Sequence, residues 1–166
     1  MATPTNLPAT FSSGAVLTAT QQNDLRGAFR ILQVVSATTT TATATSSATF
    51  ADTTLTATIT PQSSSSKILI IIAHNGCTKS NANAFTCMSL RLLRGATVLQ
   101  TFGNALAFTN VAQDANFQAS NTFLDSPATT SATTYKTQVA SPFGFATATV
   151  QASSTPSNII LMEVSA

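Results

Sequence analysis

The sequence predicts an all-β protein: an antiparallel, jelly-roll-like β-sandwich preceded by an extended N-terminal arm with one short helix. The strongest signal is a short apolar run, 68–73, between a serine-rich segment and the turn-like pair Asn75-Gly76. Its β-branched side chains indicate a strand that is covered on both faces. Threonine, serine and alanine dominate the composition, and only 7% of the residues are charged. Threonine suits the outer face of a strand, so the composition also favours β structure.

The length of 166 residues suits one compact domain with a tail. We expect a docking arm with a short helix over residues 1–27 and a β-sandwich domain over residues 28–166. About eight to ten alternating segments follow residue 27, which is typical of a sandwich or jelly roll.

The first residues carry Pro4 and Pro8 among small polar side chains, which predicts an extended arm. Thr18 and Gln21 have the spacing of a capping box, and Gly27 is a stop signal, so we expect a helix over 19–26. The apolar side chains that could anchor this arm to a partner are Leu7, Phe11, Leu17 and Leu25.

The first half of the sandwich alternates in period two from Ala28 to Val35. The threonine-rich segment 37–45 fits either a linker or a strand, and we favour a strand because threonine is a good β residue. Segments 54–60 and 67–74 are expected to form a hairpin, since Pro61 and four serines separate them.

The second half predicts a strand over 85–92 that returns over 97–102 after a turn at Arg94-Gly95. The segment 103–120 reads as loops with one short strand. Further strands are expected at 119–124 and 133–139 and, after an aromatic loop, at 158–164.

The groups that catalysis needs are few and dispersed. His74 is the only histidine, and at the end of a strand a structural role is favoured over that of a catalytic base. The carboxylates show no paired motif, which disfavours glycosidase chemistry. They are Asp24, Asp52, Asp114, Asp125 and Glu163. We therefore expect no enzyme, no catalytic residue and no cofactor.

Cys77 and Cys87 flank one expected loop, so a disulfide between them is a candidate. Free buried thiols are favoured over the disulfide, because assembly in a reducing cytoplasm disfavours oxidation. A zinc site ranks below both, since only these two sulfurs and one histidine are present. No metal site is expected.

Two surface features are candidates for an interface or a tip. Arg91 and Arg94 lie near a strand end, where solvated charges paired with Asp125 or Asp114 are the favoured interpretation and subunit contact is the alternative. Phe143 and Phe145 flank Gly144 in a loop, and exposed aromatic side chains of this kind are typical of oligomer interfaces.

The basic residues are scattered and give a net charge of +2, and one tyrosine and no tryptophan are available for base stacking. Nucleic acid is therefore not expected as a partner. The sequence shows neither a signal peptide nor an apolar stretch of about 18 residues, so no membrane anchor is expected. This fits a protein that is assembled in a cytoplasm and released by lysis.

Several motifs together resemble a β module of tailed-phage virion proteins, found in tail-fibre-like and other virion proteins of aquatic phages. They are R-I-L-Q-V-V-S-A-T-T-T, L-T-A-T-I-T-P-Q-S-S-S-S-K-I-L-I, L-R-L-L-R-G-A-T-V-L, F-L-D-S-P-A-T-T-S-A-T-T-Y-K-T-Q-V and I-I-L-M-E-V. The arm T-F-S-S-G-A-V-L-T-A-T-Q-Q-N-D-L is similar to attachment segments of phage appendage proteins. The resemblance covers about residues 30–166 and implies a structural virion protein, commonly trimeric, without catalytic residues.

The resemblance leaves head and tail open. Because a long fibre shaft is absent from the sequence, we expect a homotrimeric capsid decoration protein on the virion exterior, docked through its arm on the major capsid protein. The alternative is a short tail fibre or receptor-binding knob that is attached to tail proteins and contacts host glycan through loops 76–84 and 141–146. A carbohydrate-active enzyme is the remote alternative.

Overall fold

The computed structural model describes residues 14, 16, 18, 31–80 and 83–165. Strands dominate this part of the chain, and its one helical element is a short 3₁₀ turn, η1 (Ala152–Ser154). The strands are β1 (Ile31–Thr39), β2 (Thr43–Thr45), β3 (Ala51–Ile59), β4 (Lys67–Ser80), β5 (Thr86–Arg94), β6 (Thr97–Thr109), β7 (Ala115–Asp125), β8 (Thr133–Ala140), β9 (Thr147–Val150) and β10 (Ser157–Val164). The expected all-β class is confirmed, and no described helix is long and apolar enough to cross a membrane.

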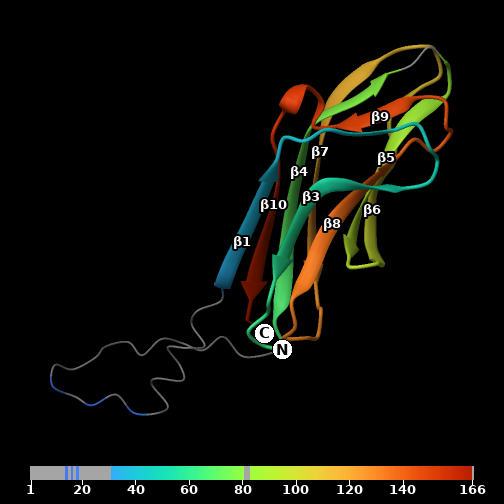
Figure 1. Cartoon of the computed structure of the whole chain (residues 1–166). Helices are drawn as coiled ribbons and strands as arrows, with labels where there is room; N and C mark the ends of the chain where they lie inside the picture. Colours follow the sequence, from blue (N-terminus) through green and yellow to red (C-terminus); the bar gives the residue numbers. More distant parts are fainter. Residues whose placement is uncertain (1–13, 15, 17, 19–30, 81–82, 166) are drawn as a thin grey trace.

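The strands form two antiparallel sheets that face each other (Figure 1). Sheet A has the order β1-β10-β4-β9-β2, with β7 on the other edge of β4. Strands β10 and β9 share one edge of β4, β10 beside its first half and β9 beside its end. Sheet B has the order β3-β8-β5-β6.

The pairs are nested along the chain: β1 with β10, β3 with β8, β4 with β7, and β5 with β6. The expected β5–β6 hairpin is therefore confirmed. The expected hairpin over 54–74 is wrong, because β3 lies in sheet B and β4 in sheet A. The segment between them, with Pro61 and the serines, crosses from one sheet to the other.

Strand β4 is longer than expected and runs through the expected turn. Asn75 and Gly76 form an irregularity in the β4–β7 ladder between His74 and Cys77. Gly76 takes φ +59°, a left-handed conformation that glycine adopts without a Cβ penalty. The turn signal thus marks a β-bulge inside one strand.

The core lies between the sheets and consists of alternate side chains along the strands. Its larger cluster combines both sheets: Leu55, Ala57, Ile59, Ile68, Ile70, Ile72, Leu92, Tyr135, Ile159 and Leu161. A second cluster around Met88, Leu90 and Val139 extends the core toward the other end. Strand β4 contributes to both clusters, so the apolar run is the centre of the sandwich.

Two further expectations have different outcomes. The threonine-rich segment does form strand, ending β1 at Thr39 and making β2. The expected loops over 103–120 are wrong, because β6 continues to Thr109 and β7 begins at Ala115. The expected helix over 19–26 and the docking residues Leu7, Phe11, Leu17 and Leu25 lie outside the described residues.

Candidate functional site

The outer face of sheet A carries an apolar patch in three registered rows across β1, β10, β4 and β7. Antiparallel pairing places directly opposed residues on the same face, so the rows follow from the register. The central row is Val34, Met162, Leu69 and Leu124. Ile160 and Ile71 lie in the next row, and Ile31 and Val164 in the row on the other side. We call these eight residues the sheet A patch.

No side chain of the described structure covers the sheet A patch fully. Val34 keeps 54% of its surface exposed and Leu124 keeps 51%, while Leu69 and Ile71 are half-buried. The expectation that the apolar run of β4 is covered on both faces is therefore wrong within the single chain. Sheet B covers the inner side chains of β4. The outer side chains of β4 face away from the core.

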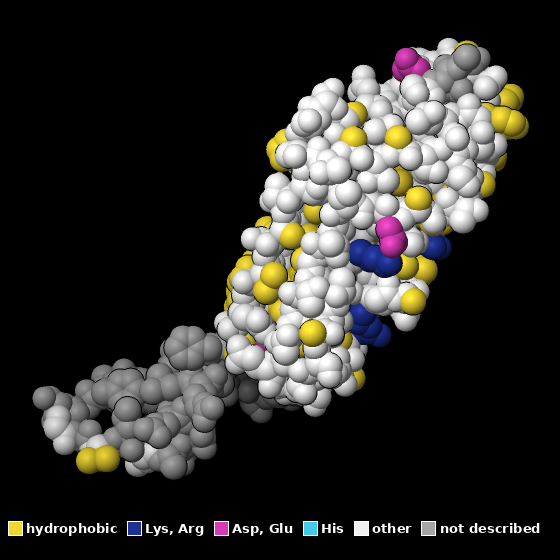
Figure 2. Space-filling model, viewed as in Figure 1, with side chains coloured by type: hydrophobic (Ala, Val, Ile, Leu, Met, Phe, Trp, Pro, Cys, Tyr) yellow, Lys and Arg dark blue, Asp and Glu magenta, His cyan; other side chains and the backbone are white. Residues whose placement is uncertain are grey.

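The patch also lacks charge. On β1, β4, β7 and β10 the ionisable side chains Glu163, Lys79, His74 and Asp125 are buried, and only Lys67, at one corner of the patch, is exposed. In Figure 2, hydrophobic side chains follow the left flank of the lower half of the molecule, where Figure 1 places β1. A face with this composition is suited to contact with another apolar surface.

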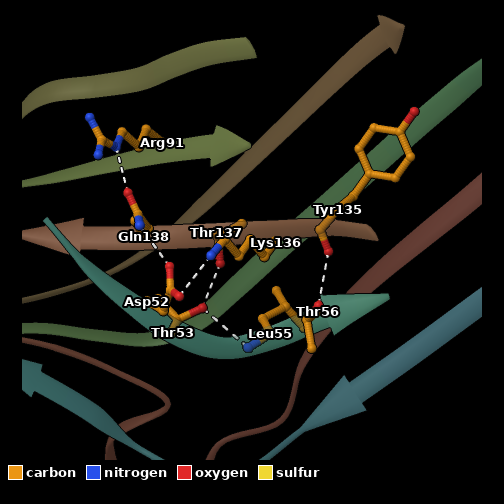
Figure 3. Close-up of polar contacts among 9 residues, drawn as sticks. All are labelled: Asp52, Thr53, Leu55, Thr56, Arg91, Tyr135, Lys136, Thr137 and Gln138. Carbon is orange, nitrogen blue, oxygen red and sulfur yellow. Dashed lines mark hydrogen bonds and ion pairs between the residues drawn. The ribbon is translucent and has the colours of Figure 1, made fainter. Parts of the chain in front are cut away.

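The outer face of sheet B is polar by contrast (Figure 3). Arg91 Nε donates to Gln138 Oε1 at 2.7 Å, and Gln138 Nε2 donates to Asp52 Oδ1 at 2.6 Å. Lys136 Nζ lies 2.7 Å from Asp52 Oδ2. Hydrogen bonds from Lys136 and Gln138 lower the pKa of Asp52. The guanidinium of Arg91 also lies 4.0 Å from the ring centroid of Phe50.

Arg94 lies at the end of β5 and pairs with Asp125, which is the favoured sequence interpretation. Its Nη1 atom lies 2.9 and 2.8 Å from the two carboxylate oxygens of Asp125. The hydroxyl of Tyr135 donates to Asp125 Oδ2 at 2.6 Å, and burial together with this carboxylate raises the tyrosine's pKa. These contacts join β7, at the edge of sheet A, to β5 and β8 of sheet B, so Arg94 links the two sheets.

The expected aromatic loop does expose Phe143 and Phe145, and the structure places two further phenylalanines nearby. Asn83 Nδ2 donates to the carbonyl of Phe145 at 3.3 Å, which brings the 83–85 segment beside this loop. Phe85 in turn lies 6.4 Å from Phe108, measured between ring centroids. We call Phe85, Phe108, Phe143 and Phe145 the aromatic tip.

The start of β5 and the end of β6, which place Phe85 and Phe108, lie at the end of the sandwich opposite the start of β1 (Figure 1). Backbone strain accompanies the aromatic tip, because Phe85 has φ +57° and Ala107, before Phe108, has φ +50°. Non-glycine residues in this region cost free energy and are associated with functional sites. Sequence reasoning missed Phe85 and Phe108 because single phenylalanines in strands normally indicate core.

His74 is structural, as the sequence favoured. Its Nε2 atom lies 2.9 Å from Thr137 Oγ1, and its Nδ1 atom lies 3.0 Å from Gln151 Nε2. The side chain is fully buried, and burial lowers its pKa to about 4. Thr137 continues the network to Thr53 at 2.6 Å. A neutral imidazole therefore connects the two sheets.

Both cysteines are free and buried, which is the favoured alternative. Cys77 lies on β4 of sheet A and Cys87 on β5 of sheet B, so the two strands that flank the loop between them do not pair with each other. Burial raises the pKa of Cys77 to about 11. Among the described residues, no three His, Cys, Asp or Glu side chains gather as metal ligands.

Compared with protein-family models and with curated protein sequences, the chain shows no significant match.

Proposed function

We propose that this chain is a non-enzymatic structural protein on the exterior of a tailed-phage virion. In this proposal it is a homotrimeric capsid decoration protein, assembled in the host cytoplasm and docked on the major capsid protein through residues 1–27. The sandwich then provides the contacts between subunits and the surface that faces solvent.

The observation that carries this proposal is the contrast between the two outer faces of the sandwich. The sheet A patch is apolar and uncharged, whereas Arg91, Asp52 and Lys136 form a connected polar ladder on sheet B. A protein that works alone in water has no use for a continuous apolar face, while a subunit of an assembly does. The polar face suits the outside of that assembly.

The strand pairing supports a more specific fold. We propose a jelly roll, because the nested pairs β1–β10, β3–β8, β4–β7 and β5–β6 correspond to one long antiparallel ribbon rolled into two sheets. This fold is used in viral capsid and lectin domains, so it fits a virion protein and leaves the location open.

Copy number per virion tests the decoration role. Purified virions are separated on a stained gel, and the band of this chain is compared with that of the major capsid protein. We expect hundreds of copies, and particles lacking the protein should lose their genome at lower temperature or lower salt. A dozen copies located at the tail would contradict the capsid assignment.

The docking arm is tested in the full chain by Leu7→Asp and Phe11→Asp. Both variants should keep the oligomeric state of the wild type and lose sedimentation with stripped capsids, because a carboxylate cannot enter an apolar contact. Thr5→Asp is the matched control, since it adds the same charge at a polar position. Unchanged capsid binding by both variants would refute the docking role.

The aromatic tip favours a second candidate, the receptor-binding knob on tail proteins. Four exposed phenylalanines, at the end of the sandwich opposite the start of β1, could stack on the apolar faces of host sugars. Purified protein should then compete with phage for host cells, and Phe143→Ser with Phe145→Ser should abolish competition. If wild type does not compete at all, the knob is rejected.

A further inference from the structure

We propose that the sheet A patch is the subunit interface of a homotrimer in which three copies pack as the sides of a triangular prism. The proposal rests on the trimer of the proposed function and assigns its contact surface. Its occupant is a second copy of this chain, in contact through β1 of one copy and β7 of the next.

The size of the face fits the apolar centre of a subunit interface. Four strands about 4.8 Å apart and three rows about 7 Å apart give a face of about 400 Å², and the eight apolar residues of the patch occupy about two thirds of it. A stable interface buries about 800 Å² per partner and has an apolar centre with a polar rim. The next row of the same face, Thr38, Asn158, Ala73 and Ser120, begins such a rim.

The width of the face also suits a threefold arrangement, because it sets the distance from each face to the threefold axis. A triangle with sides of about 19 Å, the width of four strands, has its centre about 5.5 Å from each side. Sheets pack face to face at about 10 Å, so each sheet contributes a side-chain layer of about 5 Å. Three copies of this face would therefore meet at the axis without a void or an overlap.

The shape of the patch favours a copy of the sheet over a single extended segment. An extended chain crossing β1 to β7 covers about one row of side chains, because strands pack about 5 Å apart. The patch is three rows deep, and its central strands carry Met162, Leu69, Ile160 and Ile71. A flat partner with the same rows covers all of them.

The prism makes a specific prediction about which residues meet. Met162 and Leu69 lie on the central strands and would face the axis, while Val34 and Leu124 lie on the outer strands and would face the corners. In a threefold ring every contact is head to tail, so Val34 of one copy meets Leu124 of the next. Neither residue meets its own equivalent.

Cysteine cross-linking in the full chain tests this geometry. The double variant Val34→Cys with Leu124→Cys, oxidised and run without reductant, should give a covalent trimer of three 17.1 kDa chains. Each single variant should remain a monomer on the same gel. The native thiols do not interfere, because Cys77 and Cys87 are 0% and 1% exposed. Val34→Cys with Val98→Cys is the matched control and should not cross-link, since Val98 lies on sheet B.

A charge placed in the patch gives an independent readout. Leu124→Lys should change the mass in solution from trimer to monomer at micromolar concentration, while Val98→Lys, also at an exposed valine, should leave the trimer intact. A wild-type monomer, a trimeric Leu124→Lys variant, or dimers from a single-cysteine variant would each overturn the inference.

These outcomes separate the inference from the proposed function. A trimer that cross-links as expected but is absent from virions would reject the virion role and leave the interface standing. Hundreds of copies on virions together with an uncross-linked double variant would reject the interface and leave the virion role standing.

Discussion

His74 Nε2 lies 2.9 Å from Thr137 Oγ1, and this contact joins the central strand of sheet A to a central strand of sheet B. On its other side the imidazole faces Gln151. The ring lies among hydrogen-bonding partners that suit the neutral form, and its burial opposes protonation.

The first prediction concerns acid sensitivity. Because the pKa of His74 falls from 6.5 to about 4 on folding, the unfolded chain binds a proton in this range that the folded chain does not. Stability should therefore decrease as the pH falls from about 6.5 to about 4, by up to about 3 kcal/mol. Urea unfolding at several pH values measures this slope. The His74→Asn variant should show a smaller slope, because only the carboxylates whose pKa is lowered, such as Asp52, still contribute there. An equal slope in that variant would contradict the assignment.

The second prediction concerns the two ion pairs. Asp125→Asn should cost about 2 kcal/mol of unfolding free energy, because it removes the charge that Arg94 and Tyr135 share in a buried position. Asp52→Asn is the matched control: Asp52 is 53% exposed, so its pair with Lys136 should be worth less than about 1 kcal/mol. Chemical denaturation of both variants checks the order, and a larger loss for Asp52→Asn would refute it.

The third prediction concerns the bulge in β4. A Cβ at Gly76 would lie 2.8 Å from the carbonyl oxygen of Ala152, in addition to the strain of a left-handed φ. Gly76→Ala should therefore cost about 3 kcal/mol or more. Gly95→Ala has a similar φ and nothing within 4 Å, so it should cost only about 1 kcal/mol. Melting temperatures compare the two, and equal losses would show that contact with Ala152 is unimportant.

The fourth prediction concerns the thiols. Cys77 and Cys87 should not react with an aromatic disulfide reagent in the native protein, since both are buried and burial raises the pKa of each. Both should react once the protein is unfolded in denaturant without reductant. Absence of reaction after unfolding would show a disulfide instead.

Much of the fold could be predicted because side-chain alternation is a local property. The inward positions of 55–59 were readable from period two, and Leu55, Ala57 and Ile59 all reach the core. The apolar run 68–73 shows no alternation in the sequence, and only the structure decides that Ile68, Ile70 and Ile72 face inward. The pairing of strands was not readable, because the first strand joins the last and Pro61 marks a crossing between sheets. The turn signal at Asn75-Gly76 misled because a bulge and a turn both need a left-handed glycine.

The candidate surfaces show the same division. Phe143 and Phe145 were predictable from their loop composition, whereas Phe85 and Phe108 join them only through strand pairing and the strained backbone. The sequence left two partners open for the arginines of β5, Asp125 and Asp114. The pairing of β7 with β4 places Asp125 within 2.8 Å of Arg94, so the structure selects Asp125.

The sequence by itself determined that this protein is built of strands, which side chains of each strand share a face, and that its surface depends on hydroxyl groups. The tertiary structure alone decided that Val34, Met162, Leu69 and Leu124 form one row. These residues are far apart along the chain, and only long-range backbone hydrogen bonds set their register. Alternation along a strand shows which of its own residues share a face. Which residues of other strands lie beside them is determined only when the whole sheet forms.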